Sequence, residues 1–80
     1  MHQSHAYSVV LCPKPEGGFT VRVPAFPEIV TYGQDEQEAL TMAREAIELS
    51  VEHRLDTGDE IPLGDATILR TVSVELPSAA

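Results

Sequence analysis

The sequence predicts an α+β domain with the element order β-β-β-α-β, in which one long helix packs on one face of a small, antiparallel-rich sheet. Three observations predict this fold. Short β-favouring runs separated by proline and glycine come first, and a long segment with apolar residues at three- and four-residue steps follows. A final run is rich in isoleucine, valine and threonine. With 80 residues, we expect one domain over 1–80, with a core of about residues 6–76 and flexible ends.

The first three strands are separated by proline-containing connections. The first strand is expected at Tyr7–Cys12, and the two prolines and paired glycines of 13–18 predict a turn or hairpin loop after it. In Phe19–Val23 apolar and polar residues alternate, which is typical of a strand with one buried face. The stiff connection 24–27 then leads to a third strand at Glu28–Tyr32.

The helix is expected to begin after Asp35 and to end at Gly58. Asp35 is a favourable N-cap, and Glu38, three residues later, can accept a hydrogen bond from the backbone N–H of the cap. Gly58 suits the left-handed position that ends a helix. Small residues on the apolar stripe, such as Ala39 and Ala43, allow the helix to lie close to a sheet.

A fourth strand is expected over Thr67–Leu76, which would return to the sheet after the helix. A four-stranded sheet has two open edges, and one helix covers only one of its faces. Because open edges tend to pair with other strands, the sequence favours a homo-oligomer, either a dimer or a tetramer.

The formal net charge of −8 disfavours direct binding to nucleic acid, since that affinity comes largely from lysine and arginine. A basic protein partner and a simple role of the charge in solubility both fit. Cys12 is the single cysteine, so no intrachain disulfide can form. We expect a cytoplasmic protein that does not associate with membranes, because neither a signal segment nor a membrane-spanning apolar run is present.

The sequence favours a protein that is not an enzyme and holds neither a metal nor a cofactor. Acids that strands could direct at a divalent cation are few, namely Glu28 and Glu75. Most other acids fall in the helix and the loop after it, where a solvated face explains them. His2 and His5 lie near the chain end without a third ligand, and His53 suits the negative end of the helix dipole.

Seven residues are candidates for contact with a partner protein. Phe26, held between two prolines, fits either the core or a contact with another chain. Tyr32 fits either packing on the sheet or an anchor in an interface, where tyrosine is enriched. The other five are acids that can steer a basic partner: Glu45, Glu48, Glu52, Asp59 and Glu60.

A series of short motifs occurs in a characteristic order. These are a Gly-Gly-aromatic hairpin, a proline-bounded connection, a strand ending in Thr-x-Gly and two Glu-Ala steps; they lie at 17–19, 23–27, 31–33, 38–39 and 43–46. In this order, from Tyr7 to Pro62, the chain resembles the HicB antitoxin-like family. The resemblance implies a partially degraded ribonuclease H-like fold and binding to HicA, a small basic toxin that cleaves messenger RNA.

Two positions depart from the family pattern. Ala25 stands where an acid is usual, and Glu28 stands where a glycine is usual. Many family members also carry a C-terminal DNA-binding domain, which we do not expect in a chain ending at Ala80. The leading expectation is an antitoxin that covers the RNA-binding face or catalytic histidine of its toxin. An orphan, self-associating structural or regulatory domain without a toxin is the alternative, and a residual metal-dependent nuclease is the less favoured third.

Overall fold

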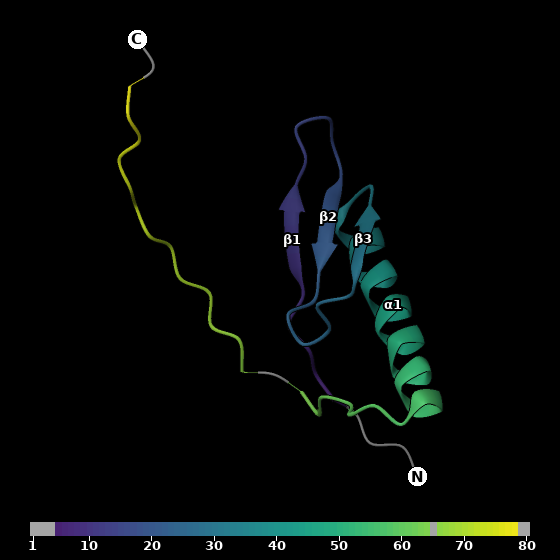
Figure 1. The fold of residues 1–80 in the computed structure, drawn as a ribbon. Helices are drawn as coiled ribbons and strands as arrows, with labels where there is room; N and C mark the ends of the chain where they lie inside the picture. Colours follow the sequence, from purple (N-terminus) through teal and green to yellow (C-terminus); the bar gives the residue numbers. More distant parts are fainter. Residues whose placement is uncertain (1–4, 65, 79–80) are drawn as a thin grey trace.

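The first half of the chain forms a three-stranded antiparallel sheet, and one helix follows it (Figure 1). The structure is a computed structural model and describes residues 5–64 and 66–78. The elements are β1 (Val10–Pro13), β2 (Phe19–Arg22), β3 (Val30–Gly33) and α1 (Glu36–Thr57). The strands lie in the order β1-β2-β3, so β2 is central, whereas β1 and β3 are edges. The expected α+β class is therefore confirmed.

The strand register places alternate residues on two different faces of the sheet. Leu11 pairs with Val21, which in turn pairs with Thr31, and Val21 is fully buried against α1. The next row contains Thr20 between its partners Cys12 and Tyr32, on the face that the helix does not cover. The alternation seen in the sequence therefore separates a core face from an open face.

The core consists of two adjoining clusters beneath α1. The first contains Val21, Ala39 and Ala43, and the second contains Val23, Phe26 and Ile29 with Tyr7, Ala46, Ile47 and Val51 packed around it. The helix approaches the end of β3 very closely. A Cβ atom on Gly33 would lie 2.4 Å from the Cα atom of Ala39, so glycine is needed at this crossing.

Both helix caps follow the local sequence signals. The backbone N–H of Glu38 donates to Oδ1 of Asp35 (2.7 Å), and Gly58 adopts a left-handed φ of 78° with its N–H donating to the Arg54 carbonyl. One detail differs from the expected capping box. The Glu38 carboxylate accepts from the N–H of Gln34 (2.8 Å), one residue before the cap.

The expected fourth strand over 67–76 is a wrong prediction. Residues 66–78 follow an extended path without forming a strand, and their large apolar side chains are exposed. Figure 1 shows this segment, in green and yellow, running away from the sheet. The segment has suitable β-forming residues, but a strand also needs a neighbouring backbone to bond with, and the described chain places none beside it. Of the ends expected to be flexible, outside about 6–76, residues 1–4 and 79–80 lie outside the described residues.

The strands also have different bounds from those expected. The first begins at Val10 instead of Tyr7, and the third begins at Val30 and includes Gly33. Two tight turns explain the later start of β3, because the N–H of Phe26 donates to the Val23 carbonyl and the N–H of Ile29 donates to the Phe26 carbonyl (both 2.9 Å).

Candidate functional site

An acidic stripe runs along the outer face of α1. Glu45, Glu48 and Glu52 recur at three- and four-residue steps, and together with Leu49 they line a shallow hollow. All three carboxylates are exposed, and Leu49 is 66% exposed among them. Neither of the ion pairs found in the described part of the chain involves these acids. Like charges at this spacing each weaken a helix by about 0.2–0.5 kcal/mol, so the stripe does not exist to stabilise α1.

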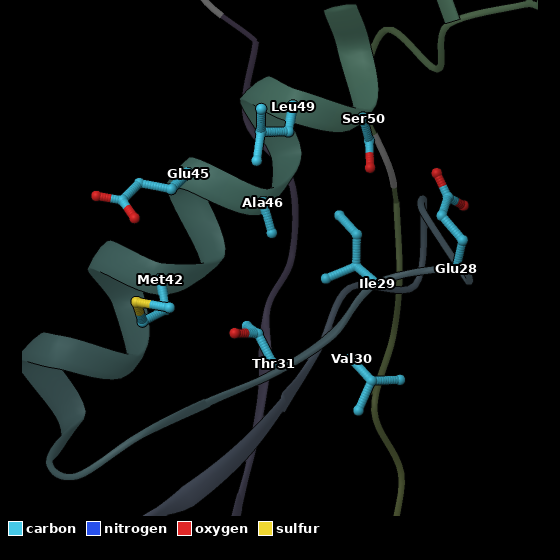
Figure 2. A pocket seen from close by; sticks show the side chains of 9 residues that line it. All are labelled: Glu28, Ile29, Val30, Thr31, Met42, Glu45, Ala46, Leu49 and Ser50. Carbon is cyan, nitrogen blue, oxygen red and sulfur yellow. The ribbon is translucent and has the colours of Figure 1, made fainter. Parts of the chain in front are cut away.

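The stripe adjoins an apolar groove between α1 and the chain that enters β3 (Figure 2). Glu45 and Glu28 lie toward its two ends, with apolar side chains from both elements between them. The groove is lined by Glu28, Ile29, Val30, Thr31, Met42, Glu45, Ala46, Leu49 and Ser50. Because β3 is an edge strand, an open line of backbone hydrogen-bonding groups lies beside this groove. We call the stripe, the groove and the β3 edge together the acidic groove face.

Sequence reasoning identified the acids of this face and missed its apolar residues. Val30, Met42 and Leu49 were not singled out, although Val30 and Leu49 are among the exposed large apolar side chains. The signal for Leu49 was present, because it falls between glutamates and off the buried stripe of the helix.

Tyr32 lies on the open face of the sheet, away from α1. It is 42% exposed, and the Lys14 ammonium lies 4.6 Å from its ring centroid. The hairpin glycine Gly18 has room only for a hydrogen atom here, since a Cβ would lie 2.5 Å from the Tyr32 hydroxyl oxygen. Tyr32 thus packs on the hairpin, with part of its ring exposed to solvent, but it does not share a face with the acidic stripe.

Phe26 is fully buried, so the structure places it in the core and away from any surface a partner could touch. Its ring packs edge-on against Tyr7, with centroids 5.2 Å apart at an interplanar angle of 71°. The guanidinium of Arg54 lies 4.8 Å above the same ring. Of the two roles open from the sequence, the core role matches this position, and contact of Phe26 with a partner is disfavoured by its burial.

Arg54 ties the end of α1 to the connection before β3. Its Nη2 donates to both carboxylate oxygens of Glu28 (2.9 and 3.0 Å), and its Nη1 donates to the backbone carbonyl of Glu60 (3.0 Å). A backbone hydrogen bond and the Arg54 guanidinium hold the pKa of Glu28 below its ordinary value. Glu28 and Arg54 therefore form an ion pair in which one guanidinium nitrogen contacts both carboxylate oxygens.

Asp59 and Glu60 lie at the end of α1 and outside the groove. The Asp59 carboxylate accepts from the Thr57 hydroxyl (2.9 Å), and both acids border a separate hollow with Glu28, His53 and Arg54. The seven candidates therefore do not form one site. Three of them form the acidic stripe, two lie at the end of the helix, and Tyr32 and Phe26 are elsewhere.

Within residues 5–64 and 66–78, no group of three or more histidine, cysteine, aspartate or glutamate side chains is placed to hold a metal ion. His5 instead donates through Nδ1 to the carbonyl of Leu63 (2.8 Å), whereas His2 lies outside the described residues. No helix within the same ranges is long and apolar enough to cross a membrane.

Comparison with known proteins gives a family match over almost the whole chain. A family model described as "HicB_like antitoxin of bacterial toxin-antitoxin system" matches residues 6–80. The chain is 40% identical over 57 residues to antitoxin HicB 1 of Photorhabdus laumondii, covering 71% of this chain and 37% of the relative. It is 31% identical over 71 residues to antitoxin HicB of Escherichia coli K12, covering 89% of this chain and 51% of the relative.

A shorter relative matches along most of its own length. UPF0150 protein Ta0767 of Thermoplasma acidophilum is 33% identical over 60 residues, which cover 75% of this chain and 87% of that protein. By contrast, the matched region spans only about a third to a half of the two antitoxins.

Proposed function

Because the chain belongs to the HicB-like antitoxin family of bacterial toxin-antitoxin systems, we propose that it binds and neutralises a small, basic, RNA-cleaving toxin of the HicA type. Antitoxins of this family are non-catalytic, so the chain is a binding protein and not an enzyme. Its action would be occlusion, in which the antitoxin covers the RNA-binding face or the catalytic histidine of the toxin. The proposal places this action in the cytoplasm, where messenger RNA is found.

The acidic groove face is the observation that supports this proposal. A toxin that binds RNA needs a basic surface, and carboxylates at the positions of Glu45, Glu48 and Glu52 complement such a surface. The groove beside them offers apolar area, which supplies affinity that exposed charges alone do not. The open edge of β3 adds backbone groups that a partner strand can bond with.

The experiment uses the small basic protein encoded beside this chain in its genome, if one is present. Its RNA cleavage is measured with increasing amounts of the antitoxin, and the association rate is measured by surface plasmon resonance at two salt concentrations. We expect inhibition at one equivalent and association that slows as salt rises, since exposed charges are screened.

Two matched variants remove the same number of negative charges from different parts of the surface. Glu45→Gln with Glu48→Gln removes two charges from the stripe, and Glu16→Gln with Glu75→Gln removes two charges elsewhere. At about 0.2–1 kcal/mol for each of the two exposed charges, the stripe variant should bind roughly two- to thirtyfold more weakly. Equal effects of the two variants would contradict the assignment of the acidic groove face as the binding surface. If the toxin cleaved RNA at the same rate with and without this chain, the proposed function would be contradicted.

We further propose that the chain forms a homo-oligomer, a dimer or a tetramer. Two open sheet edges and a set of exposed apolar side chains support this proposal. The same observation favours the second candidate function, a self-associating regulatory domain without a toxin. A genome that lacks a neighbouring small basic protein, together with a stable oligomer of the purified chain, would favour that candidate.

A further inference from the structure

Residues 66–78 expose more large apolar side chains than any other part of the described chain. Five of them are 69–82% exposed: Ile68, Leu69, Val72, Val74 and Leu76. A segment of this composition is unfavourable in water unless something covers it. We call residues 66–78 the C-terminal arm.

The arm has the alternation of a strand with one buried face. Positions 68, 72, 74 and 76 are all isoleucine, valine or leucine, with Arg70 between them. The intervening positions 67, 71, 73 and 75 are polar, and Leu69 is the exception. In an extended backbone the first set lies on one face and the second on the other.

The sheet offers a matching place at its β1 edge. Among the described residues, β1 pairs with β2 alone, so its outer edge is open to a further strand. The helix packs against β3 and β2 and leaves a groove next to the N-terminal end of β1, with His5, Arg44 and Glu48 among its lining beside apolar side chains. Tyr7 and Val9 line this groove from one side, and Leu40 and Ile47 line it from the helix. A strand added to the β1 edge would direct its apolar face into this groove.

The chain shortly before the arm is held to the N-terminal segment by two hydrogen bonds. The Tyr7 hydroxyl donates to the Pro62 carbonyl, and His5 donates to the Leu63 carbonyl. Gly64 follows with a φ of 147°, a backbone conformation that side chains disfavour. From there the arm projects beyond the body of the molecule, and the overall dimensions reach 59 × 25 × 21 Å (Figure 1).

We propose that the C-terminal arm of one copy pairs with the β1 edge of a second copy, so that two chains exchange arms. This inference rests on the homo-oligomer proposed above and specifies its interface. The nine residues 68–76 span roughly 30 Å when extended, at about 3.3 Å per residue, which is enough to follow the whole β1 edge. Reciprocal exchange about one two-fold axis occupies the β1 edge of each copy and covers both arms.

The first test compares charges on the two faces of the arm. Val72→Lys with Val74→Lys adds two charges to the apolar face, and Thr71→Lys with Ser73→Lys adds the same two charges to the polar face. Sedimentation equilibrium of the full chain should give a dimer for the wild type and the polar-face variant, and a monomer for the apolar-face variant. Circular dichroism should show the same helix content in all three.

The outcomes separate the two proposals. A monomeric wild-type chain would overturn self-association and the arm exchange together. A dimer that persists in the apolar-face variant would overturn arm exchange and leave self-association standing.

The second test uses the exposed Cys12 of β1, which lies on the open face of the sheet. A cysteine is introduced on the polar face of the arm, by Thr71→Cys, Ser73→Cys or Glu75→Cys in turn, because these positions sample the pairing register. Arm exchange predicts that at least one variant forms disulfide-linked dimers under mild oxidation, while Glu16→Cys in the hairpin does not. Internal disulfides in monomers, or the absence of cross-linking in all three, would overturn the exchange.

Discussion

The close approach of Gly33 in β3 to Ala39 in α1 predicts a large effect for the substitution Gly33→Ala. The added Cβ would lie 2.4 Å from both Cα and N of Ala39, and 2.8 Å from its Cβ. The first two atoms belong to the helix backbone, so a side-chain rotation cannot relieve the clash, and α1 must move away from β3. Overpacking of this kind costs about 1–3 kcal/mol.

The unfolded chain offsets part of that cost, because replacing glycine with alanine reduces its conformational entropy by about 0.4–1 kcal/mol. The net destabilisation is then about 1.3 kcal/mol at the middle of these two ranges and about 2.6 kcal/mol at the upper end. Such a loss is large for a domain whose whole stability is of the order of 5 kcal/mol. Urea unfolding of the wild type and the variant, followed by circular dichroism, measures the difference.

Two controls make the result specific. Gly58→Ala has nothing within 4 Å of the new Cβ and adds only the strain of its left-handed backbone, about 1 kcal/mol. Ala39→Gly combined with Gly33→Ala should not restore stability, because the clash with the Ala39 backbone remains. A Gly33→Ala variant as stable as the wild type would refute the close packing of α1 on β3.

The remaining predictions concern the helix cap, the core and the ion pair. Asp35→Ala should lower the unfolding free energy by about 1 kcal/mol, whereas Asp35→Asn should largely retain it, as urea titration will show. Phe26→Ala should cost about 3–5 kcal/mol, whereas Tyr32→Ala on the open face should cost much less; similar losses would contradict the burial difference. Folding lowers the pKa of Glu28, so the ionised carboxylate stabilises the folded state. This contribution is fully present above the pKa that Glu28 has in the unfolded chain, and it is lost as the pH falls through the pKa that Glu28 has in the folded chain. Glu28→Gln and Arg54→Leu should therefore both reduce the loss of stability on acidification, measured as thermal midpoints between pH 7 and pH 3.

Local signals predicted the helix well. The cap at Asp35 and the terminating glycine at Gly58 act within a few residues of the chain, so the sequence contains all that determines them. The alternation of apolar and polar residues in β2 is also a signal that lies within a few residues of the chain. The Arg54–Glu28 ion pair was not predictable, because its partners are 26 residues apart and the turns at Phe26 bring them together.

The fourth strand shows the limit of such reasoning. Val72 and Val74 have the side chains and spacing of a strand, but a strand exists only when another backbone bonds to it. Pairing is a property of the partner as well as of the segment, and composition does not identify the partner. For the candidate site, the spacing of Glu45, Glu48 and Glu52 predicted an acidic helix face, whereas the groove beside it depends on how α1 crosses β3.

The most direct test of the proposed function is a map of where the toxin touches this chain. Backbone amides of the ¹⁵N-labelled protein are followed by NMR while unlabelled toxin is added, and their hydrogen exchange is then compared with that of the free protein. We expect shifted signals and slower exchange in β3 and in the middle of α1, from Met42 to Glu52. Changes confined to β1 and the C-terminal arm, with the acidic groove face unaffected, would contradict the account.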